Sequence, residues 1–204
     1  AVKMNFFTHI AISKILYNHL KSQMELNKTD FIYGNIKPDL TRRVLKKPHI
    51  LDNYLDYVCD GAGNLMKGEV PLEEFSIELG EICHYVCDFF CRYHLNIEIF
   101  NNLKGHFFYE LRLHFVLLRL SREEKSEMEI NNKKANRDIE SIISAMRADY
   151  FSKTATFKKD ISYAISTAIW VCESVVYFMA RSTGPASNND KIDSYVMVPS
   201  AGGK

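Results

Sequence analysis

Two pairs of potential metal ligands lie four residues apart in the sequence, His84 with Asp88 and His106 with Glu110. If each pair lies on a helix, its two side chains share one face and can approach the same metal ion. A single pair of this kind is weak evidence in a helical protein. Two pairs on successive helices, with His94 between them, indicate a metal centre with mixed histidine and carboxylate ligands.

Other metal schemes fit the sequence less well. A carboxylate-bridged di-iron bundle needs Glu-x-x-His on two helices, and only Glu81 with His84 supplies that spacing. The HD-type metal phosphohydrolases are disfavoured because no His-Asp dipeptide occurs. A thiolate site stays open as an alternative, since helical spacing puts three cysteines on one face, although they are more simply interpreted as small core residues: Cys83, Cys87 and Cys91.

The segments that position these residues are predicted to be helical throughout. Apolar periodicity and capping signals predict about six helices, the first capped by Thr8 and the others over residues 49–64, 71–93, 103–122, 135–152 and 156–181. Residues 28–48 contain Gly34 and Pro38 and are predicted to form a long loop, which Pro38 would stiffen. The charged stretch 123–134 either extends the fourth helix or breaks it.

Length and composition predict one all-α domain, a single helical bundle around the metal centre. The chain has 204 residues, of which 47% are hydrophobic and 25% charged, and this is enough for one sizeable core. We expect the helical domain to cover residues 1–181 and a flexible tail to cover residues 182–204.

Charge and cysteine content narrow the expected partners and location. The net charge of +1 disfavours a long nucleic acid, so a phosphate partner would be attracted by a local site. No run of about 18 uncharged apolar residues is present, which predicts no transmembrane segment and leaves transient contact with a membrane surface open. The lack of a signal-peptide pattern and the odd number of cysteines, five, predict a cytoplasmic protein.

The order and spacing of these residues resemble the zinc-dependent phospholipase C family. The matching series runs through Phe31-x-x-Gly34-x-x-x-Pro38-Asp39, His49, Leu79-Gly80-x-x-x-His84-Tyr-x-x-Asp88-Phe-Phe, His94 and His106-x-x-x-Glu110. It covers about residues 5–115, and the spacing of His84, Asp88 and His94 is its most specific part. The single-strand-specific S1/P1 nucleases are more distantly similar, but they carry Asp at the position of Glu110.

The resemblance implies two or three zinc ions and assigns ligands to each. One zinc would be held by Asp39, His49, His84 and Asp88, and a second by His94, His106 and Glu110. Asp88 would bridge to a third zinc, completed by His9 and the chain's amino end, for which Met4 has a suitable spacing. Because the second zinc would have three protein ligands, it would keep an open position, as catalytic zinc sites do.

The resemblance also implies the chemistry. A metal-activated hydroxide would attack phosphorus in line with the leaving group, and Asp39 is the candidate to orient or deprotonate the water. The expected substrate is a phosphoester small molecule or a phospholipid head group. A nuclease or 3′-nucleotidase activity and a non-catalytic zinc-binding protein are the alternatives. Arg92 is a candidate phosphate contact, and His114 and Glu81 are candidates to support the ligands by hydrogen bonds.

Overall fold

The computed structural model describes residues 6–40, 47–120 and 138–183, and these residues form helices joined by short connections. The elements are α1 (Phe6–Leu20), α2 (Lys28–Leu40), α3 (Leu51–Leu65), α4 (Leu72–Asp88), the 3-10 helix η2 (Arg92–His94), α5 (Ile97–Phe100), α6 (Leu103–Arg119), α8 (Ile139–Phe151) and α9 (Phe157–Thr183). The predicted all-α bundle is confirmed. It has eight α-helices in the described residues where about six were predicted, because α2 and α5 were not expected.

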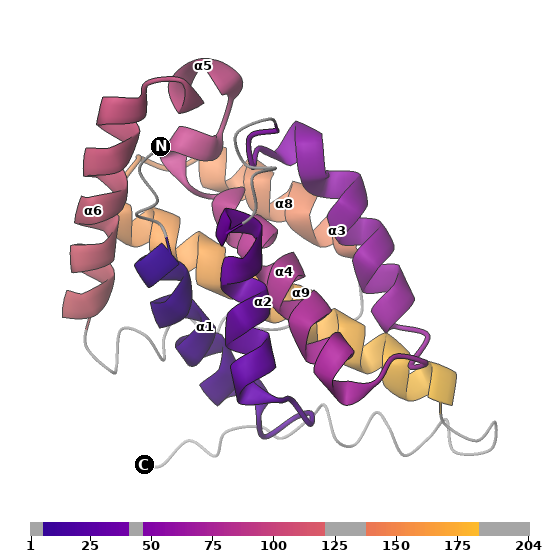
Figure 1. Ribbon diagram of the computed structural model, residues 1–204. Helices are drawn as coiled ribbons and strands as arrows, with labels where there is room; N and C mark the ends of the chain where they lie inside the picture. Colours follow the sequence, from indigo (N-terminus) through magenta and orange to yellow (C-terminus); the bar gives the residue numbers. More distant parts are fainter. Residues whose placement is uncertain (1–5, 41–46, 121–137, 184–204) are drawn as a thin grey trace, which may run out of the picture.

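Helix α4 is the central element of the bundle (Figure 1). Helices α2, α3 and α9 all pack against it, and every residue from Leu79 to Asp88 is buried. A helix that is covered on all sides needs apolar residues on nearly every face, and Ile82, Val86 and the cysteines of this segment meet that need. His84 and Asp88 are therefore held in the core rather than on the surface.

Residues 28–40 form helix α2, so the prediction of a long loop over residues 28–48 was wrong for most of that range. The Asn27 side chain accepts hydrogen bonds from the backbone N–H groups of Thr29 and Asp30, at 3.0 and 3.2 Å, and so caps the helix. Pro38 lies in the last turn, where it removes a single backbone hydrogen bond. These signals outweigh the helix-breaking residues on which the loop prediction depended.

Gly34 lies in α2 because this helix crosses α4 at very close range. A Cβ atom on Gly34 would meet the Ile77 carbonyl oxygen at 2.1 Å, and one on Gly80 would meet the Phe31 carbonyl oxygen at 2.4 Å. Neither contact is possible for a larger residue without moving the helices apart. The two glycines thus set the approach of α2 to α4.

Several predicted boundaries also need correction. Thr8 does not cap the first helix, since α1 already begins at Phe6 and Thr8 is buried within it. Helix α4 ends at Asp88 rather than near residue 93, because the chain tightens into η2. Helix α9 continues to Thr183, past the predicted start of the tail, and the stretch 123–134 lies outside the described residues.

Helix α9 is long and apolar enough, over Phe157–Ser182, to cross a membrane by length and composition alone. The helix was predicted over residues 156–181, but its apolar stretch was not recognised because isolated charged residues interrupt it. Within the described fold, 72% of its most apolar window is buried, and it packs on α4, α8, α1 and α6. This burial is typical of a core helix, so the finding is weak support for a membrane span.

Candidate metal centre

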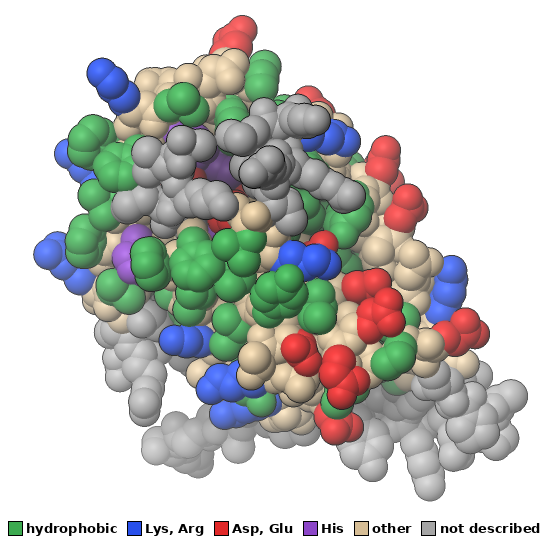
Figure 2. Space-filling view, in the orientation of Figure 1, with side chains coloured by type: hydrophobic (Ala, Val, Ile, Leu, Met, Phe, Trp, Pro, Cys, Tyr) green, Lys and Arg blue, Asp and Glu red, His purple; other side chains and the backbone are tan. Residues whose placement is uncertain are grey.

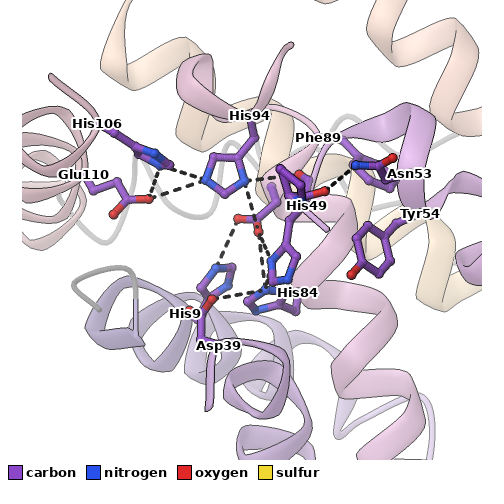
Figure 3. A network of polar contacts seen from close by, with 12 residues as sticks. His9, Asp39, His49, Asn53, Tyr54, His84, Phe89, His94, His106 and Glu110 are labelled. Carbon is purple, nitrogen blue, oxygen red and sulfur yellow. Dashed lines mark hydrogen bonds and ion pairs between the residues drawn. The ribbon is translucent and has the colours of Figure 1, made fainter. Parts of the chain in front are cut away.

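The eight side chains predicted as metal ligands converge beside the carboxyl end of α4 (Figure 3). All except Asp39 are buried, and the Asp39 side chain is 16% exposed. They come from α1, α2, the segment before α3, α4, η2 and α6, as follows: His9, Asp39, His49, His84, Asp88, His94, His106 and Glu110.

The first half of the centre comprises His9, Asp39, His49, His84 and Asp88. His49 Nδ1 lies 3.0 Å from Asp88 Oδ2 and 3.0 Å from His84 Nε2. His84 Nε2 also lies 3.3 Å from Asp88 Oδ2 and 3.8 Å from Asp39 Oδ1. His9 stacks on the His84 ring and brings its Nε2 atom to 3.2 Å from Asp88 Oδ1. Two overlapping groups of ligand atoms result, one with His9, Asp39 and His84 and one with His49, His84 and Asp88.

The second half of the centre comprises Cys91, His94, His106 and Glu110, whose ligand atoms all lie within 4.8 Å of one another. His106 Nε2 lies 2.7 Å from Glu110 Oε1 and 2.9 Å from His94 Nε2, and His94 Nε2 lies 3.5 Å from Glu110 Oε1. Cys91 was not assigned to this group from the sequence. Its spacing to His94, Cys-x-x-His, is the signal that could have identified it.

Asp88 connects the two halves. Its Oδ2 atom lies 3.3 Å from His94 Nδ1 in addition to its contacts with His49 and His84, and its Oδ1 atom faces His9. A carboxylate placed in this way can serve two metal ions with its two oxygens. The sequence-based expectation was that Asp88 bridges the first zinc and the third, which His9 completes, and the contacts of its oxygens with His49, His84 and His9 are compatible with it.

Hydrogen bonds to the main chain orient two of the histidines toward the centre. His84 Nδ1 lies 2.7 Å from the Asn35 carbonyl oxygen, and His94 Nδ1 lies 3.2 Å from the His49 carbonyl oxygen. A carbonyl can only accept, so each Nδ1 carries a proton, which leaves each Nε2 as the nitrogen that can bind a metal ion. This is the arrangement by which proteins fix metal-binding histidines.

The centre fits a divalent cation. Both ring nitrogens of His9 and the Asp39 Oδ2 atom are buried without a hydrogen-bond partner among the described residues, and the contact of His9 with Asp88 is outside hydrogen-bonding geometry. Unpartnered buried polar atoms are costly, and a cation bound to them would remove that cost. Zinc prefers imidazole nitrogen, carboxylate oxygen and thiolate sulfur, which are the donors present.

Protonated histidines balance the negative charge of the carboxylates in the cluster, and a bound cation could take over that role. Burial opposes ionisation of Asp88 and Glu110, but the surrounding histidines outweigh it and lower both pKa values. Burial also opposes protonation of His94, yet the charge of Asp88 raises the pKa of His94 to about 10. Burial lowers the pKa of His49. Ionised carboxylates therefore attract positive charge here, which protons or a metal ion can provide.

Neighbouring side chains hold the ligands in place. The Asn53 side chain donates to the Pro48 carbonyl at 2.8 Å, which fixes the segment that carries His49. Tyr93 stacks on the His106 ring, with ring centroids 5.2 Å apart. Tyr109, next to Glu110, donates to the buried Asp160 carboxylate of α9.

The remaining candidates lie at the edge of the centre or away from it. His114 Nδ1 lies 3.3 Å from the Thr8 hydroxyl, and so joins α6 to α1 next to His9. Glu81 pairs with Lys37 and accepts a hydrogen bond from Tyr57 at 2.8 Å, so its contacts join α2, α3 and α4. The Arg92 side chain is exposed, and Met4 lies outside the described residues.

Comparison with known protein families gives a match that covers most of the described helices. The family model described as zinc dependent phospholipase C matches residues 8–157. This match includes all eight predicted ligands and reaches beyond the region of the sequence resemblance, through α8 to the start of α9. No curated protein and no solved structure matched the chain. The matched segment covers well over half of the sequence, and the chain therefore belongs to the zinc-dependent phospholipase C family.

Proposed function

We propose that this protein is a zinc-dependent phosphodiesterase of the phospholipase C type, which hydrolyses the head-group phosphoester of a phospholipid with two or three bound zinc ions. One observation carries the proposal: the buried Asp88 carboxylate contacts histidines of both halves of the centre, His9, His49 and His84 in the first and His94 in the second, within a chain of this family. Adjacent metal sites joined by a carboxylate are the usual basis of metal-assisted phosphoester hydrolysis.

The first zinc would be held by His49, His84 and Asp88, with Asp39 at its edge. The second would be held by His94, His106 and Glu110. His9 faces Asp88 and Asp39 and would serve a third. When bound, zinc would lower the pKa of a coordinated water and offset the charge that develops on phosphate oxygens.

The side chains of this protein supply the orientation and the proton transfer. Asp39 is the proposed base, because it is the one predicted ligand with partial exposure and its Oδ2 atom has no hydrogen-bond partner among the described residues. It can accept a proton from the attacking water while its other oxygen faces His84. The carbonyls of Asn35 and His49 hold the rings of His84 and His94, so the ligands need not reorganise during the reaction.

Exposed apolar side chains that are close in sequence to three of the ligands support a lipid substrate. Leu40 follows Asp39 directly, Ile97 is three residues after His94, and Leu103 is three residues before His106, and they are 47%, 45% and 70% exposed. Figure 2 shows histidine and carboxylate atoms in a recess on this face, with hydrophobic side chains nearby. Exposed apolar residues around a polar recess suit a substrate with a charged head and an apolar body.

The first experiment measures zinc per chain by elemental mass spectrometry, with hydrolysis of a soluble phosphodiester and of phospholipid vesicles in parallel. We expect two to three zinc ions in the wild type and a clear loss of zinc and activity in His84→Ala. His19→Ala is the matched control, because His19 pairs with Glu173 away from the centre. A wild-type protein that binds no metal after reconstitution with zinc would overturn the proposal.

The substrate class is tested with the apolar residues. Replacing Leu40, Ile97 and Leu103 by serine is expected to reduce hydrolysis of vesicles several-fold more than hydrolysis of the soluble diester. Leu118→Ser is the control, because Leu118 is 57% exposed on α6 but about 18 Å along the helix from His106. Cleavage of single-stranded DNA or of a 3′-nucleotide, without cleavage of lipid, would favour the nuclease alternative instead.

We propose a reducing compartment such as the cytoplasm as the location of the protein, because all five cysteines are free thiols.

A further inference from the structure

The second half of the centre contains a thiol in addition to its three expected ligands. The Cys91 Sγ atom and one ligand atom from each of His94, His106 and Glu110 lie within 4.8 Å of one another, and all four residues are buried. No other cysteine takes part in a group of potential ligands in the described residues. The cluster therefore contains the four donors that a closed zinc site needs.

The two cysteines that precede Cys91 at intervals of four residues provide an internal comparison. Cys83 Sγ lies 3.3 Å from Cys172 Sγ, and Cys87 Sγ lies 3.8 Å from the Ala164 carbonyl oxygen, both in the contact between α4 and α9. Their sulfur atoms thus have partners within the core. Cys91 comes after the end of α4, where the turn toward η2 brings its sulfur to the histidines instead.

The backbone of this turn fixes Cys91 and His94 relative to each other. The Cys91 N–H donates to the Asp88 carbonyl at 2.9 Å, and the His94 N–H donates to the Cys91 carbonyl at 2.8 Å. One turn of chain therefore presents sulfur and nitrogen to the same point.

The distances suit zinc. Around a tetrahedral zinc ion with bonds of about 2.0–2.3 Å, ligand atoms lie roughly 3.3–3.8 Å apart. The three measured separations among His94, His106 and Glu110 are 2.9, 2.7 and 3.5 Å, and Cys91 Sγ lies within 4.8 Å of one ligand atom of each of these residues. Small side-chain movements would bring all four atoms to bonding distance.

We propose that Cys91 is the fourth protein ligand of the second zinc, so that this ion is closed to water by Cys91, His94, His106 and Glu110. This assignment rests on the proposed function, in which the second zinc had only three protein ligands. The Cys91 thiol gives up its proton to solvent when zinc binds, and the thiolate and Glu110 then cancel the charge of the ion. The hydrolytic water therefore belongs to the first half, where Asp39 lies.

Cobalt absorption tests the proposal independently of activity. Co²⁺ replaces Zn²⁺ at such sites, and a cysteine thiolate bound to Co²⁺ gives an intense near-ultraviolet charge-transfer band that histidine and carboxylate ligands do not give. We expect this band to appear when Co²⁺ is added to the metal-free full-length chain. Its final intensity should correspond to one thiolate-bound Co²⁺ per chain. In Cys91→Ser the band should be lost, while the weaker visible bands of cobalt at the first half persist.

Cys87→Ser is the matched control, because Cys87 is buried one turn earlier and should keep the full band. If Cys91→Ser does not fold, variants that replace Cys59, Cys83, Cys87 or Cys172 locate the thiolate by elimination, since each should keep the band. A wild-type protein that binds Co²⁺ without the band, or a band that disappears in Cys87→Ser, overturns the proposal. If the zinc-loaded wild type is active but its cobalt form lacks the band, only the role of Cys91 is refuted. If the cobalt form shows the band but the zinc-loaded protein is inactive, only the hydrolase function is refuted.

Discussion

The two halves of the metal centre are built in different ways. The second half comes from one continuous stretch of 20 residues, Cys91 to Glu110, in which η2 and the first turns of α6 bring the ligands together. The first half combines side chains from α1, α2, the segment before α3 and α4, which are spread over residues 9–88. Its geometry depends on long-range helix packing, above all on the crossing of α2 with α4.

This difference predicts how each half responds to change. Local ligands keep their relative positions as long as their own turns form, whereas ligands on separate helices are displaced whenever the packing between those helices changes. The histidines of the first half are also closely coupled, because His84 belongs to both of its ligand groups. We expect damage to the packing of α2 on α4 to affect the first half alone, and damage to Asp88 to affect both halves.

Asp88→Asn is expected to have the largest effect. The substitution keeps the size of the side chain but removes the charge that faces His9, His49, His84 and His94. We expect phosphodiester hydrolysis to fall by more than about 100-fold, since even residues that only support metal ligands contribute roughly 10- to 100-fold. Zinc per chain, measured by elemental mass spectrometry, should fall by at least one ion.

Asp60→Asn is the matched control, because Asp60 is exposed on α3. It should keep both zinc and activity. Full zinc content and full activity in Asp88→Asn would mean that the two halves do not share this carboxylate.

Gly80→Ala is expected to have the next largest effect, confined to the first half. The added methyl group would meet the Phe31 carbonyl oxygen at 2.4 Å and the Asn35 nitrogen at 2.9 Å, so α2 must move away from α4. Overpacking of this kind costs about 1–3 kcal/mol in the free energy of unfolding. The shift would also carry away Asp39 and the Asn35 carbonyl that holds His84.

The measurement is urea unfolding together with cobalt or zinc titration of the two halves. Gly63→Ala is the control, since a methyl group there meets nothing within 4 Å and should stabilise α3 by about 0.5–1 kcal/mol. A Gly80→Ala protein that loses metal from the second half while keeping it in the first would contradict the distinction between the halves.

The sequence predicted several local features of this molecule correctly. The helical pattern around His84 with Asp88 and His106 with Glu110 is a short-range property, and both pairs do lie on buried faces of α4 and α6. The helices near 49–64, 103–122 and 156–181 are also close to those of the structure. Spacing and periodicity describe such features directly.

The features that the sequence did not predict depend on contacts between distant residues. Gly34 and Pro38 led to the prediction of a loop. The close approach of α4 at Gly80 explains why α2 needs a glycine at position 34. The four-residue periodicity that Cys83, Cys87 and Cys91 share does not separate them, and only the Cys-x-x-His spacing to His94 distinguishes Cys91 in the sequence. The end of α4 at Asp88 is what directs Cys91 elsewhere.

Asp160→Asn is expected to have the smallest effect. It changes the pH dependence of the stability of the packing that supports the second half. Asp160 of α9 is buried and accepts hydrogen bonds from Tyr109, next to Glu110, and from Tyr150 at 2.8 Å. Burial raises the pKa of Asp160 above its ordinary value, and this outweighs the two tyrosine hydrogen bonds, which lower the pKa. The folded protein therefore holds this proton more tightly than the unfolded chain does.

The sign of the pH effect follows from this shift. The contribution of Asp160 to stability is fully present below the pKa of the unfolded chain, near 3.9, and is lost as the pH rises through the higher pKa of the folded state, at about 1.4 kcal/mol per pKa unit. The asparagine side chain of the variant has no proton to bind in this pH range. Urea unfolding of both metal-free proteins at pH 7 and pH 4.5 should therefore show the wild type gaining stability relative to Asp160→Asn on acidification, while all other groups cancel. If the wild type instead becomes less stable relative to the variant at low pH, Asp160 is stabilised as the carboxylate. Helix α9 would then support the second half of the centre through charge rather than through a shared proton.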